Sequence, residues 1–477
     1  MTQIHRSNRG GRIDRSRELS FTFNGKRYTG YAGDTLASAL LANGVDIVNR
    51  SFKYSRPRGI VAAAIASITA ATLETQGIAG GAALRALVFS TIAGAVVLSG
   101  ALAYFYYAWL DKAVSVLLTA QRPVIVAGGG VQWSNAGDEV TRMADLIGAA
   151  ITTSYGRADA VPNDHPLYLG HLGRLGSEEA IESAKQADVI LAIGTRLGQS
   201  TAFYDNRYIP ADAKIIQIEI DPEELGRNYP VSVGIEGDAK AVMEGLIAQV
   251  QQAEPRPNQQ WVDDIGDLAA RRKRRLDAEA TDNAMPMKPQ RVYGELRRVM
   301  PRDAIIALDA GLAPNFGQDR LNYYEPRSLM TSLDLGGLGF SFPAALGAKF
   351  AAPDRPVVNF NGDGGFLFNA QEFATAVRYR LKVVTVIMNN NCWGSEKAYQ
   401  RYAFNERYVG ADTNNPRYDK FAEIFGGTGF YVERPEDIGN AFLEALNTDG
   451  PSIIEIPTDP DEMPRPARLS DVQAPKT

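Results

Sequence analysis

The clearest alternation of apolar and polar positions lies in the second half of the chain. Residues 357–361 (VVNFN) and 383–388 (VVTVIM) are short apolar runs of the kind found in buried β-strands. Between them, apolar residues recur at helical spacing over 368–379. A strand, a helix and a second strand in this order predict a right-handed parallel unit, so both strands should end at the same edge of one sheet.

Each of these strands is followed by a short polar turn. The first leads into Gly362-Asp363-Gly364-Gly365 and the second into Asn389-Asn390-Asn391. We therefore expect Asp363 and Asn390 to face each other across one crevice. One carboxylate and one amide oxygen suit Mg²⁺ and leave room for phosphate ligands, while glycines let backbone N–H groups approach phosphate oxygens. The alternative, two unrelated turns, explains this combination less well.

These turns give the chain a resemblance to a known family. The pattern resembles the diphosphate-binding domain of thiamine diphosphate (ThDP) enzymes of the acetolactate synthase group. The resemblance implies that Asp363, Asn390 and the backbone carbonyl of Cys392 hold Mg²⁺, and that Leu338 is the apolar wedge that bends the cofactor. The cofactor contacts that it implies are Gly311, Gly336, Gly337, Leu338, Gly362, Gly364, Gly365, Trp393 and Gly394.

Residues 393–397 (WGSEK) and the stretch through Arg407 and Tyr408 are most similar to sulfoacetaldehyde acetyltransferases. That resemblance implies acyl transfer, in which sulfite is cleaved from sulfoacetaldehyde and the acetyl group passes to phosphate. In the family, a glutamate of a separate pyrimidine-binding domain activates the cofactor. Residues 1–111 do not resemble that domain, so no catalytic residue is assigned and activity is expected only with a partner chain that supplies it.

Three other interpretations remain open at this point. The chain could be an acetolactate synthase-like carboligase, or a non-catalytic scaffold or regulatory protein that retains a cofactor fold. It could also be a fusion of unrelated gene pieces. The family resemblance further implies a homo-oligomer.

Upstream of the cofactor domain, residues 112–254 alternate helices with short apolar strands at 123–127, 189–193 and 215–220. This alternation predicts a doubly wound α/β domain. The resemblance identifies it as the family's central domain, with residues 163–167 (NDHPL) as a landmark. Some members hold FAD or ADP in this domain and others hold nothing. The glycines at 128–130 and 194 suggest a nucleotide site, but glycine-rich turns are common at strand ends and no complete GxGxxG motif is present, so this signal is weak.

Residues 255–289 read as a linker with one helix at 261–278. Its basic run at 271–275 (RRKRR) could bind an anion or a partner, but acidic residues upstream favour a solvated helix with local charge pairing. Residues 290–465 form the predicted cofactor domain and 466–477 a tail. The predicted fold is therefore α/β, with two doubly wound parallel-sheet domains.

The first 60 residues predict a small α+β unit. Residues 19–23 and 26–31 alternate as strands around the hairpin signal Asn24-Gly25, and Asp34 caps a helix at 35–43. This β-grasp-like unit resembles the N-terminus of the sarcosine oxidase alpha subunit. Related proteins carry a [2Fe–2S] cluster there, but residues 1–60 contain no cysteine, which excludes a cysteine-bound cluster.

Residues 61–111 contain an apolar, helical segment. Residues 86–110 run for 25 positions without a charge and end in five aromatic side chains between 104 and 109. About 20 apolar residues span a bilayer and aromatic residues favour its interface, so a membrane helix is one interpretation. The other is a buried core helix, because Ala, Gly and Ser lower the hydrophobicity.

Composition narrows the function classes further. A net charge of −5, spread along 477 residues, argues against a nucleic-acid partner. The single Cys392 excludes disulfides and fits a reducing compartment, and three histidines are too few for a His-cluster metal site. The expected location is therefore cytoplasmic, with membrane association depending on residues 86–110.

Overall fold

The structure is a computed structural model that describes residues 14–23, 26–32, 107–332 and 335–463. The chain divides into two compact units, Met1–Ala108 and Trp109–Thr477. The first unit contributes one hairpin, in which β1 (Asp14–Phe23) pairs antiparallel with β2 (Lys26–Ala32). This hairpin confirms the two N-terminal strands. The helix expected at 35–43, and the apolar segment up to residue 106, lie outside the described residues.

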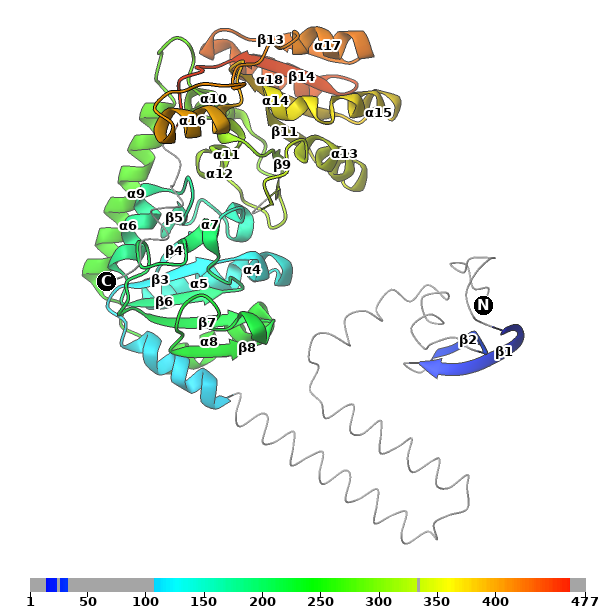
Figure 1. The fold of residues 1–477 in the computed structure, drawn as a ribbon. Helices are drawn as coiled ribbons and strands as arrows, with labels where there is room; N and C mark the ends of the chain where they lie inside the picture. The colour runs from blue at the N-terminus through cyan, green and yellow to red at the C-terminus, as the bar shows by residue number, and fades with distance from the viewer. Residues whose placement is uncertain (1–13, 24–25, 33–106, 333–334, 464–477) are drawn as a thin grey trace. The chain divides into compact units, whose positions relative to one another are not determined.

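The second unit contains two six-stranded parallel sheets with helices packed on them, as Figure 1 shows. The two α/β domains predicted from the sequence are therefore present. Among the helices of the described residues, none is both long and apolar enough to cross a membrane.

The central sheet has the strand order β5-β4-β3-β6-β7-β8. Chain order reverses direction between β3 and β6, which is the doubly wound arrangement predicted for this region. The strands are β3 (Pro123–Ala127), β4 (Ala150–Thr153), β5 (Tyr168–His171), β6 (Val189–Ile193), β7 (Lys214–Glu219) and β8 (Val233–Glu236). The main helices are α4 (Gly129–Ser134), α5 (Gly137–Ile147), α6 (Glu178–Gln186), α7 (Gln199–Ala202) and α8 (Ala239–Gln252).

The glycines after β3 and β6 serve backbone packing at this reversal. A Cβ on Gly128 would lie 2.4 Å from the Gly194 carbonyl oxygen, and one on Gly130 would lie 2.5 Å from the Gly194 Cα. Only glycines allow the two turns to touch at these distances. Packing between the two turns therefore accounts for these glycines, and they give no support to the prediction of a bound FAD or ADP.

The C-terminal sheet has the order β10-β9-β11-β12-β14-β13. Its two central strands β11 and β12 are those predicted from the apolar runs, and they pair in register from Val357↔Val383 to Gly362↔Met388. The strands are β9 (Ile305–Leu308), β10 (Leu329–Thr331), β11 (Val357–Gly362), β12 (Val383–Asn389), β13 (Thr428–Tyr431) and β14 (Ser452–Pro457).

Helices cover both faces of the C-terminal sheet. One core contains Tyr293 and Phe360, and the other contains Phe342, Phe366 and Phe373. The helices are α10 (Pro289–Val299), α11 (Leu312–Asn315), α12 (Gly317–Arg320), α13 (Ser341–Ala351), α14 (Asp363–Leu367), α15 (Phe373–Arg378), α16 (Gly394–Ala403), α17 (Tyr418–Phe425) and α18 (Pro435–Asn447).

The single helix expected over 368–379 is wrong in detail. The segment is divided between a 3-10 turn at Ala370–Glu372 and α15. Asn369 lies outside the helical part as the residue before the 3-10 turn, and its side-chain Nδ2 donates to the carbonyl oxygen of Gly339 at 2.9 Å. The apolar spacing survives the break, and both Phe366 and Phe373 are fully buried.

The linker helix α9 (Gln259–Glu279) packs on the central sheet through Trp261, Ile265 and Leu268. The side chains of its basic run, residues 271–275, are not all exposed to solvent. Lys273 is exposed, with 78% of its side-chain area accessible, but Arg272 is buried and pairs with Asp319 rather than with a residue of its own helix. The interpretation of local charge pairing was therefore wrong for Arg272.

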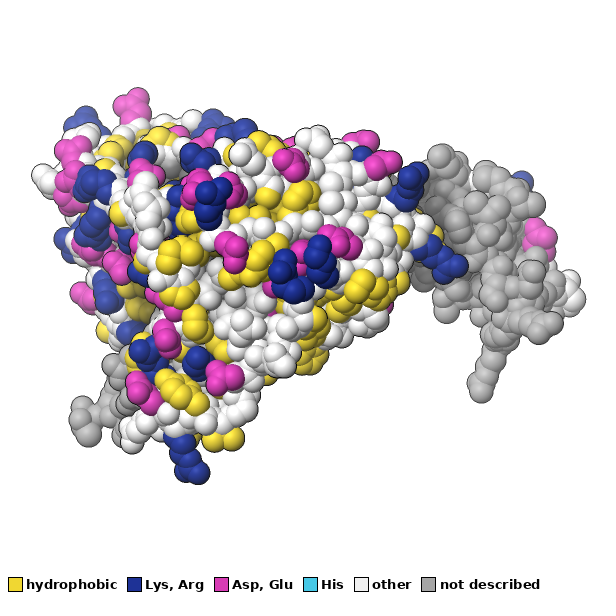
Figure 2. Space-filling model, turned by 90° about the horizontal axis from the view of Figure 1, so that it is seen from above, with side chains coloured by type: hydrophobic (Ala, Val, Ile, Leu, Met, Phe, Trp, Pro, Cys, Tyr) yellow, Lys and Arg dark blue, Asp and Glu magenta, His cyan; other side chains and the backbone are white. Residues whose placement is uncertain are grey.

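Acidic and basic side chains intermingle on the molecular face in Figure 2, and no large basic patch gathers there. This distribution agrees with the mild net charge of −5.

Candidate cofactor site

A cavity of about 330 Å³ lies at the carboxyl edge of β9, β11 and β12. The central domain forms its other wall, through the loop residues Tyr155, Arg174 and Leu175 and through Ser200 of α7. All the site residues predicted from the sequence line this cavity except Gly337. Those that line it are Gly311, Gly336, Leu338, Gly362, Asp363, Gly364, Gly365, Asn390, Cys392, Trp393 and Gly394.

Asp363 opens α14 directly after β11 and is 2% exposed. Its Oδ2 accepts hydrogen bonds from Asn415 Nδ2 at 2.5 Å and Thr413 Oγ1 at 3.3 Å. Burial raises the pKa of this carboxyl group, and these hydrogen bonds only partly oppose the shift. No lysine or arginine of the described residues forms an ion pair with it. A divalent cation would provide the missing positive charge.

The turn after β12 presents the other predicted metal ligands. Asn390 Oδ1 accepts from the Cys392 backbone N–H at 3.3 Å, and Asn391 adopts a left-handed φ of 53°. The Thr413 N–H donates to the Asn391 carbonyl at 2.9 Å, which ties the turn to the segment that also holds Asp363. The two turns are thus fixed against each other by one loop.

Cys392 has a thiol that takes no part in this arrangement. The side chain is buried, and burial raises its pKa to about 12, so the thiol stays neutral at physiological pH. Its Sγ lies 4.0 Å from the Pro460 carbonyl oxygen. The described residues hold no group of three or more His, Cys, Asp or Glu side chains that could hold a metal, so a metal here needs amide and carbonyl oxygens as well.

The glycines of the site have two different environments. A Cβ on Gly364 would lie 2.6 Å from the Trp393 ring, so this glycine lets the indole lie against the turn. A Cβ on Gly336, Gly337 or Gly362 would have no heavy atom within 4 Å. The backbone at Gly336 and Gly362 therefore borders open cavity, which is the room that phosphate oxygens need. The donor set and this space fit a magnesium-bound diphosphate.

Asp309 has a role that sequence reasoning missed. Its buried carboxylate accepts from the backbone N–H groups of Gly339 and Ser341, each at 3.0 Å, and from Ser341 Oγ at 2.8 Å. These bonds attach the segment that carries Leu338 to the end of β9. The family resemblance implied a cofactor contact at Gly311, two residues further on, whereas the Asp309 side chain itself positions the segment that carries Leu338.

Replacing Asp309 with Ala is expected to lower the free energy of unfolding by about 2–3 kcal/mol, because buried donors lose their acceptor. The measurement is urea unfolding of the full chain followed by circular dichroism. Asp303→Ala is the matched control, since Asp303 is exposed, and its cost should stay within about 0.5 kcal/mol. Equal costs for the two variants would contradict the role given to Asp309.

Other residues of the site also escaped the sequence analysis. Asn415 Nδ2 reaches Asp363 and also lies 3.0 Å from Asn389 Oδ1, and Tyr418 donates its hydroxyl to the Asp363 carbonyl at 2.9 Å. From the central domain, Tyr155 donates its hydroxyl to Asn315 Oδ1 at 3.1 Å. The sequence around Asn415 is polar, which is typical of site loops. A loop has no periodic pattern, however, so the sequence does not show which turn this segment contacts.

Comparison with known families agrees with this geometry. Residues 110–246 match the family described as "Thiamine pyrophosphate enzyme, central domain", and residues 309–456 match "Thiamine pyrophosphate enzyme, C-terminal TPP binding domain". The chain belongs to the thiamine pyrophosphate enzymes and contains these two domains. Residues 16–97 match a "2Fe-2S iron-sulfur cluster binding domain", although Cys392 is the only cysteine of the chain.

Several relatives are named sulfoacetaldehyde acetyltransferase. The protein of Alcaligenes xylosoxydans xylosoxydans is 35% identical, over 71% of this chain and 60% of its own length. That of Castellaniella defragrans is 32% identical, over 76% of this chain and 66% of its own length. The probable acetolactate synthase large subunit of Methanocaldococcus jannaschii is 34% identical, over 77% of this chain and 63% of its own length. The chain thus spans less than two thirds of each of these relatives.

Proposed function

We propose that this protein binds thiamine diphosphate with Mg²⁺ in the cavity at the carboxyl edge of the C-terminal sheet. The carboxylate of Asp363, the side-chain oxygen of Asn390 and the carbonyl oxygen of Cys392 hold the metal. The observation that carries the proposal is the buried Asp363 carboxylate, which lacks a cationic partner among the described residues and lines the same cavity as Asn390. When bound, the cofactor supplies an electron sink for breaking and forming bonds at a carbonyl carbon.

The chain's own residues prepare the space in which this chemistry takes place. Leu338 and Met388 give the cavity an apolar lining beside the polar turns. Asp309 holds the Leu338 segment in place, and Gly362 leaves the backbone open to phosphate oxygens. These groups bind and orient a ligand, and none of them is assigned a proton transfer.

The proposed reaction is acyl transfer of the sulfoacetaldehyde acetyltransferase type, in which sulfite leaves sulfoacetaldehyde and the acetyl group passes to phosphate. Relatives of that name support this choice, two of them at 35% and 32% identity. We also propose a homo-oligomer and a partner chain that contributes the pyrimidine-binding part of the site with its glutamate. The support for the partner is that the matched span covers only 60–66% of those relatives.

The test is sulfite release from sulfoacetaldehyde in the presence of phosphate, ThDP and Mg²⁺. The full chain is assayed alone and together with a purified pyrimidine-binding domain of the Alcaligenes relative. The proposal predicts sulfite release that needs both the added domain and ThDP, and a loss of roughly 100-fold or more in Asp363→Ala. ThDP binding without turnover in every combination would favour a non-catalytic scaffold.

A second candidate activity is acetolactate synthase-like carboligation. The relative named as a probable acetolactate synthase large subunit, at 34% identity, favours it. Under the same conditions with pyruvate as the substrate, formation of acetolactate in place of sulfite release from sulfoacetaldehyde would select this activity.

A further inference from the structure

One cavity-lining residue comes from the central domain and is not used by the proposed metal and diphosphate site. Among the described residues that line the cavity, Arg174 is the only lysine or arginine, and the other charged side chains are Asp363 and Glu396. Its side chain is exposed, and no carboxylate of the described residues pairs with its guanidinium. An arginine that faces a cavity without a carboxylate partner is free to bind an anion through a planar pair of N–H groups.

The loop that carries Arg174 follows β5, and backbone contacts hold it in one conformation. Gly173 has a φ of 106°, and a Cβ on it would lie 2.1 Å from the Ser200 carbonyl oxygen. The Arg174 N–H donates to that same carbonyl at 2.8 Å, while Leu175 adopts a left-handed φ of 53°. The loop is therefore fixed against the start of α7 on one side.

His171 supports the loop from the other side. This side chain is fully buried, and its Nε2 lies 3.1 Å from the Arg174 carbonyl oxygen. A carbonyl can only accept, so Nε2 carries the proton in this contact. Burial holds the pKa of His171 below its usual value, so the ring is neutral and the support does not switch near neutral pH.

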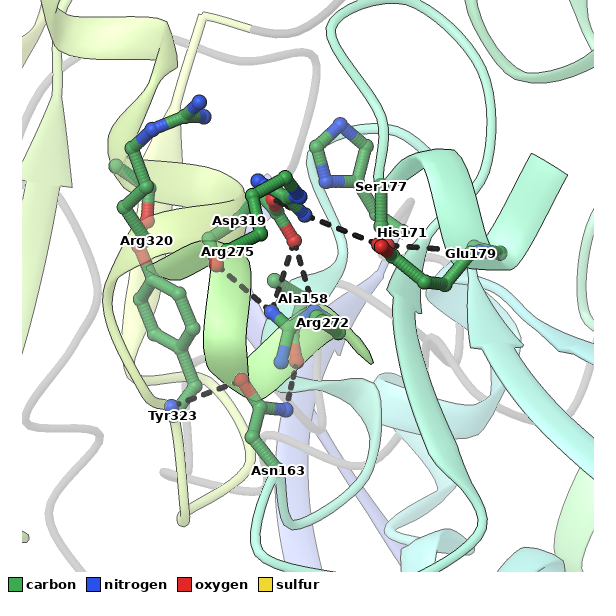
Figure 3. A network of polar contacts seen from close by, with 12 residues as sticks. Ala158, Asn163, His171, Ser177, Glu179, Arg272, Arg275, Asp319, Arg320 and Tyr323 are labelled. Atoms are coloured by element: carbon green, nitrogen blue, oxygen red, sulfur yellow. Dashed lines mark hydrogen bonds and ion pairs between the residues drawn. The ribbon is translucent and has the colours of Figure 1, made fainter. Parts of the chain in front are cut away.

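Figure 3 shows an ion-pair network that includes Ser177, the residue at the end of this loop. Arg272 Nη2 lies 2.8 Å from Asp319 Oδ1, and Arg275 Nη2 lies 3.0 Å from Asp319 Oδ2 and 3.1 Å from Glu179 Oε2. Ser177, at the end of the loop, donates its hydroxyl to Glu179 Oε2 at 2.9 Å. The network thus joins α9, α12 and the start of α6, and it contacts the chain at Gly170 and Ser177, on either side of the Arg174 loop.

We infer that Arg174 is a specificity-determining residue that binds the anionic group of the substrate, a sulfonate or a carboxylate, across the cavity from the metal site. The inference rests on the proposed function, which places the reacting carbonyl in this cavity. The fixed backbone anchors Arg174 at the cavity wall, and no carboxylate of the described residues neutralises its guanidinium beforehand. This arrangement would select two-carbon substrates that carry a negative charge over neutral aldehydes.

The experiment measures binding of isethionate, the unreactive alcohol analogue of sulfoacetaldehyde, to the full chain by calorimetry at low salt, with ethanol as the neutral probe. Titrations are run with and without ThDP and Mg²⁺. Arg174→Gln is expected to weaken isethionate binding about tenfold or more, because a charge-assisted hydrogen-bond pair is lost. Arg174→Lys should keep part of the affinity, since it retains the charge but not the planar fork. Ethanol should not distinguish the variants.

Arg227→Gln is the control for net charge, because Arg227 is an exposed arginine of the same domain that pairs with Glu224 outside the cavity. It should leave isethionate binding unchanged. Equal isethionate affinity in wild type and Arg174→Gln, or no binding by the wild type, would overturn the inference. So would an equal loss of ThDP affinity in Arg174→Gln, which would assign the arginine to the diphosphate. Failure of the wild type to bind ThDP would instead refute the proposed function, while the isethionate comparison still decides the role of Arg174.

Discussion

Replacing Asp363 with Asn is expected to abolish Mg²⁺-dependent binding of thiamine diphosphate while leaving the ligand-free protein at least as stable as the wild type. The asparagine amide is neutral, so the metal loses the only anionic ligand assigned to it. The affinity for thiamine diphosphate in Mg²⁺ should therefore fall by more than about 100-fold. The measurement is thermal unfolding with and without ligands. Ligands at 100 times their dissociation constant stabilise a native protein by about 2.7 kcal/mol, and Asp363→Asn should lose this gain.

The stability part of this prediction follows from the sign of the pKa shift. Burial raises the pKa of Asp363 above 3.8 in the folded protein. The protonated form is therefore favoured by folding, and this contribution is complete below pH 3.8 and lost as the pH rises through the raised pKa. Asparagine carries no charge to bury at pH 7. Metal binding needs the ionised form, so metal affinity should decrease as the pH falls through the same raised pKa.

Glu396→Gln is the matched control for Asp363→Asn, because Glu396 is another carboxylate that lines the same cavity but has an exposed side chain. It should retain the ligand-induced stabilisation. Loss of that stabilisation in both variants, or in neither, would contradict the assignment of Asp363 as the metal ligand.

Asp319→Ala is expected to cost about 3–5 kcal/mol of stability, because it leaves Arg272 and Arg275 without their shared carboxylate in the buried network. Urea unfolding of the full chain measures this cost. Asp449 provides the control, since it also contacts two cations, Arg380 and Lys382, but is 81% exposed. Asp449→Ala should change stability by less than about 1 kcal/mol. A similar small change for Asp319→Ala would contradict the structural importance of the network.

The pH dependence of this network has the opposite sign to that of Asp363. Burial alone would raise the pKa of Asp319, but the charges of Arg272 and Arg275 outweigh it and hold the pKa well below 3.8. The carboxylate therefore contributes stability that is complete above pH 3.8 and is lost as the pH falls toward the lowered pKa. Wild type should lose stability in that acidic range more steeply than Asp319→Ala.

The parts of the fold that the sequence predicted are those with local signals. The apolar runs of β11 and β12 lie next to the turns at Asp363 and Asn390, and parallel pairing brings the ends of neighbouring strands together. These two facts sufficed to place both residues at one cavity. Whether they bind a metal there stays a prediction.

The parts that the sequence could not predict depend on contacts between distant segments. Arg272 and Asp319 are 47 positions apart, and Asn415 is 52 positions from Asp363. The periodicity of a helix indicates only which of its faces is apolar. It therefore predicted a solvated face for the basic run of α9 and could not identify the partner of Arg272. Arg174 lies in a loop without any period. Its place in the cavity follows from how the central and C-terminal domains pack.

The most direct measurement is a calorimetric titration of the full chain with thiamine diphosphate, in Mg²⁺ and in EDTA. With Mg²⁺, the wild type should bind one cofactor per chain, and Asp363→Ala and Asn390→Ala should each give little or no heat. In EDTA, the wild-type heat should disappear. Equal heats from wild type and Asp363→Ala, or binding that is unaffected by EDTA, would contradict a metal-bound diphosphate held by these two residues.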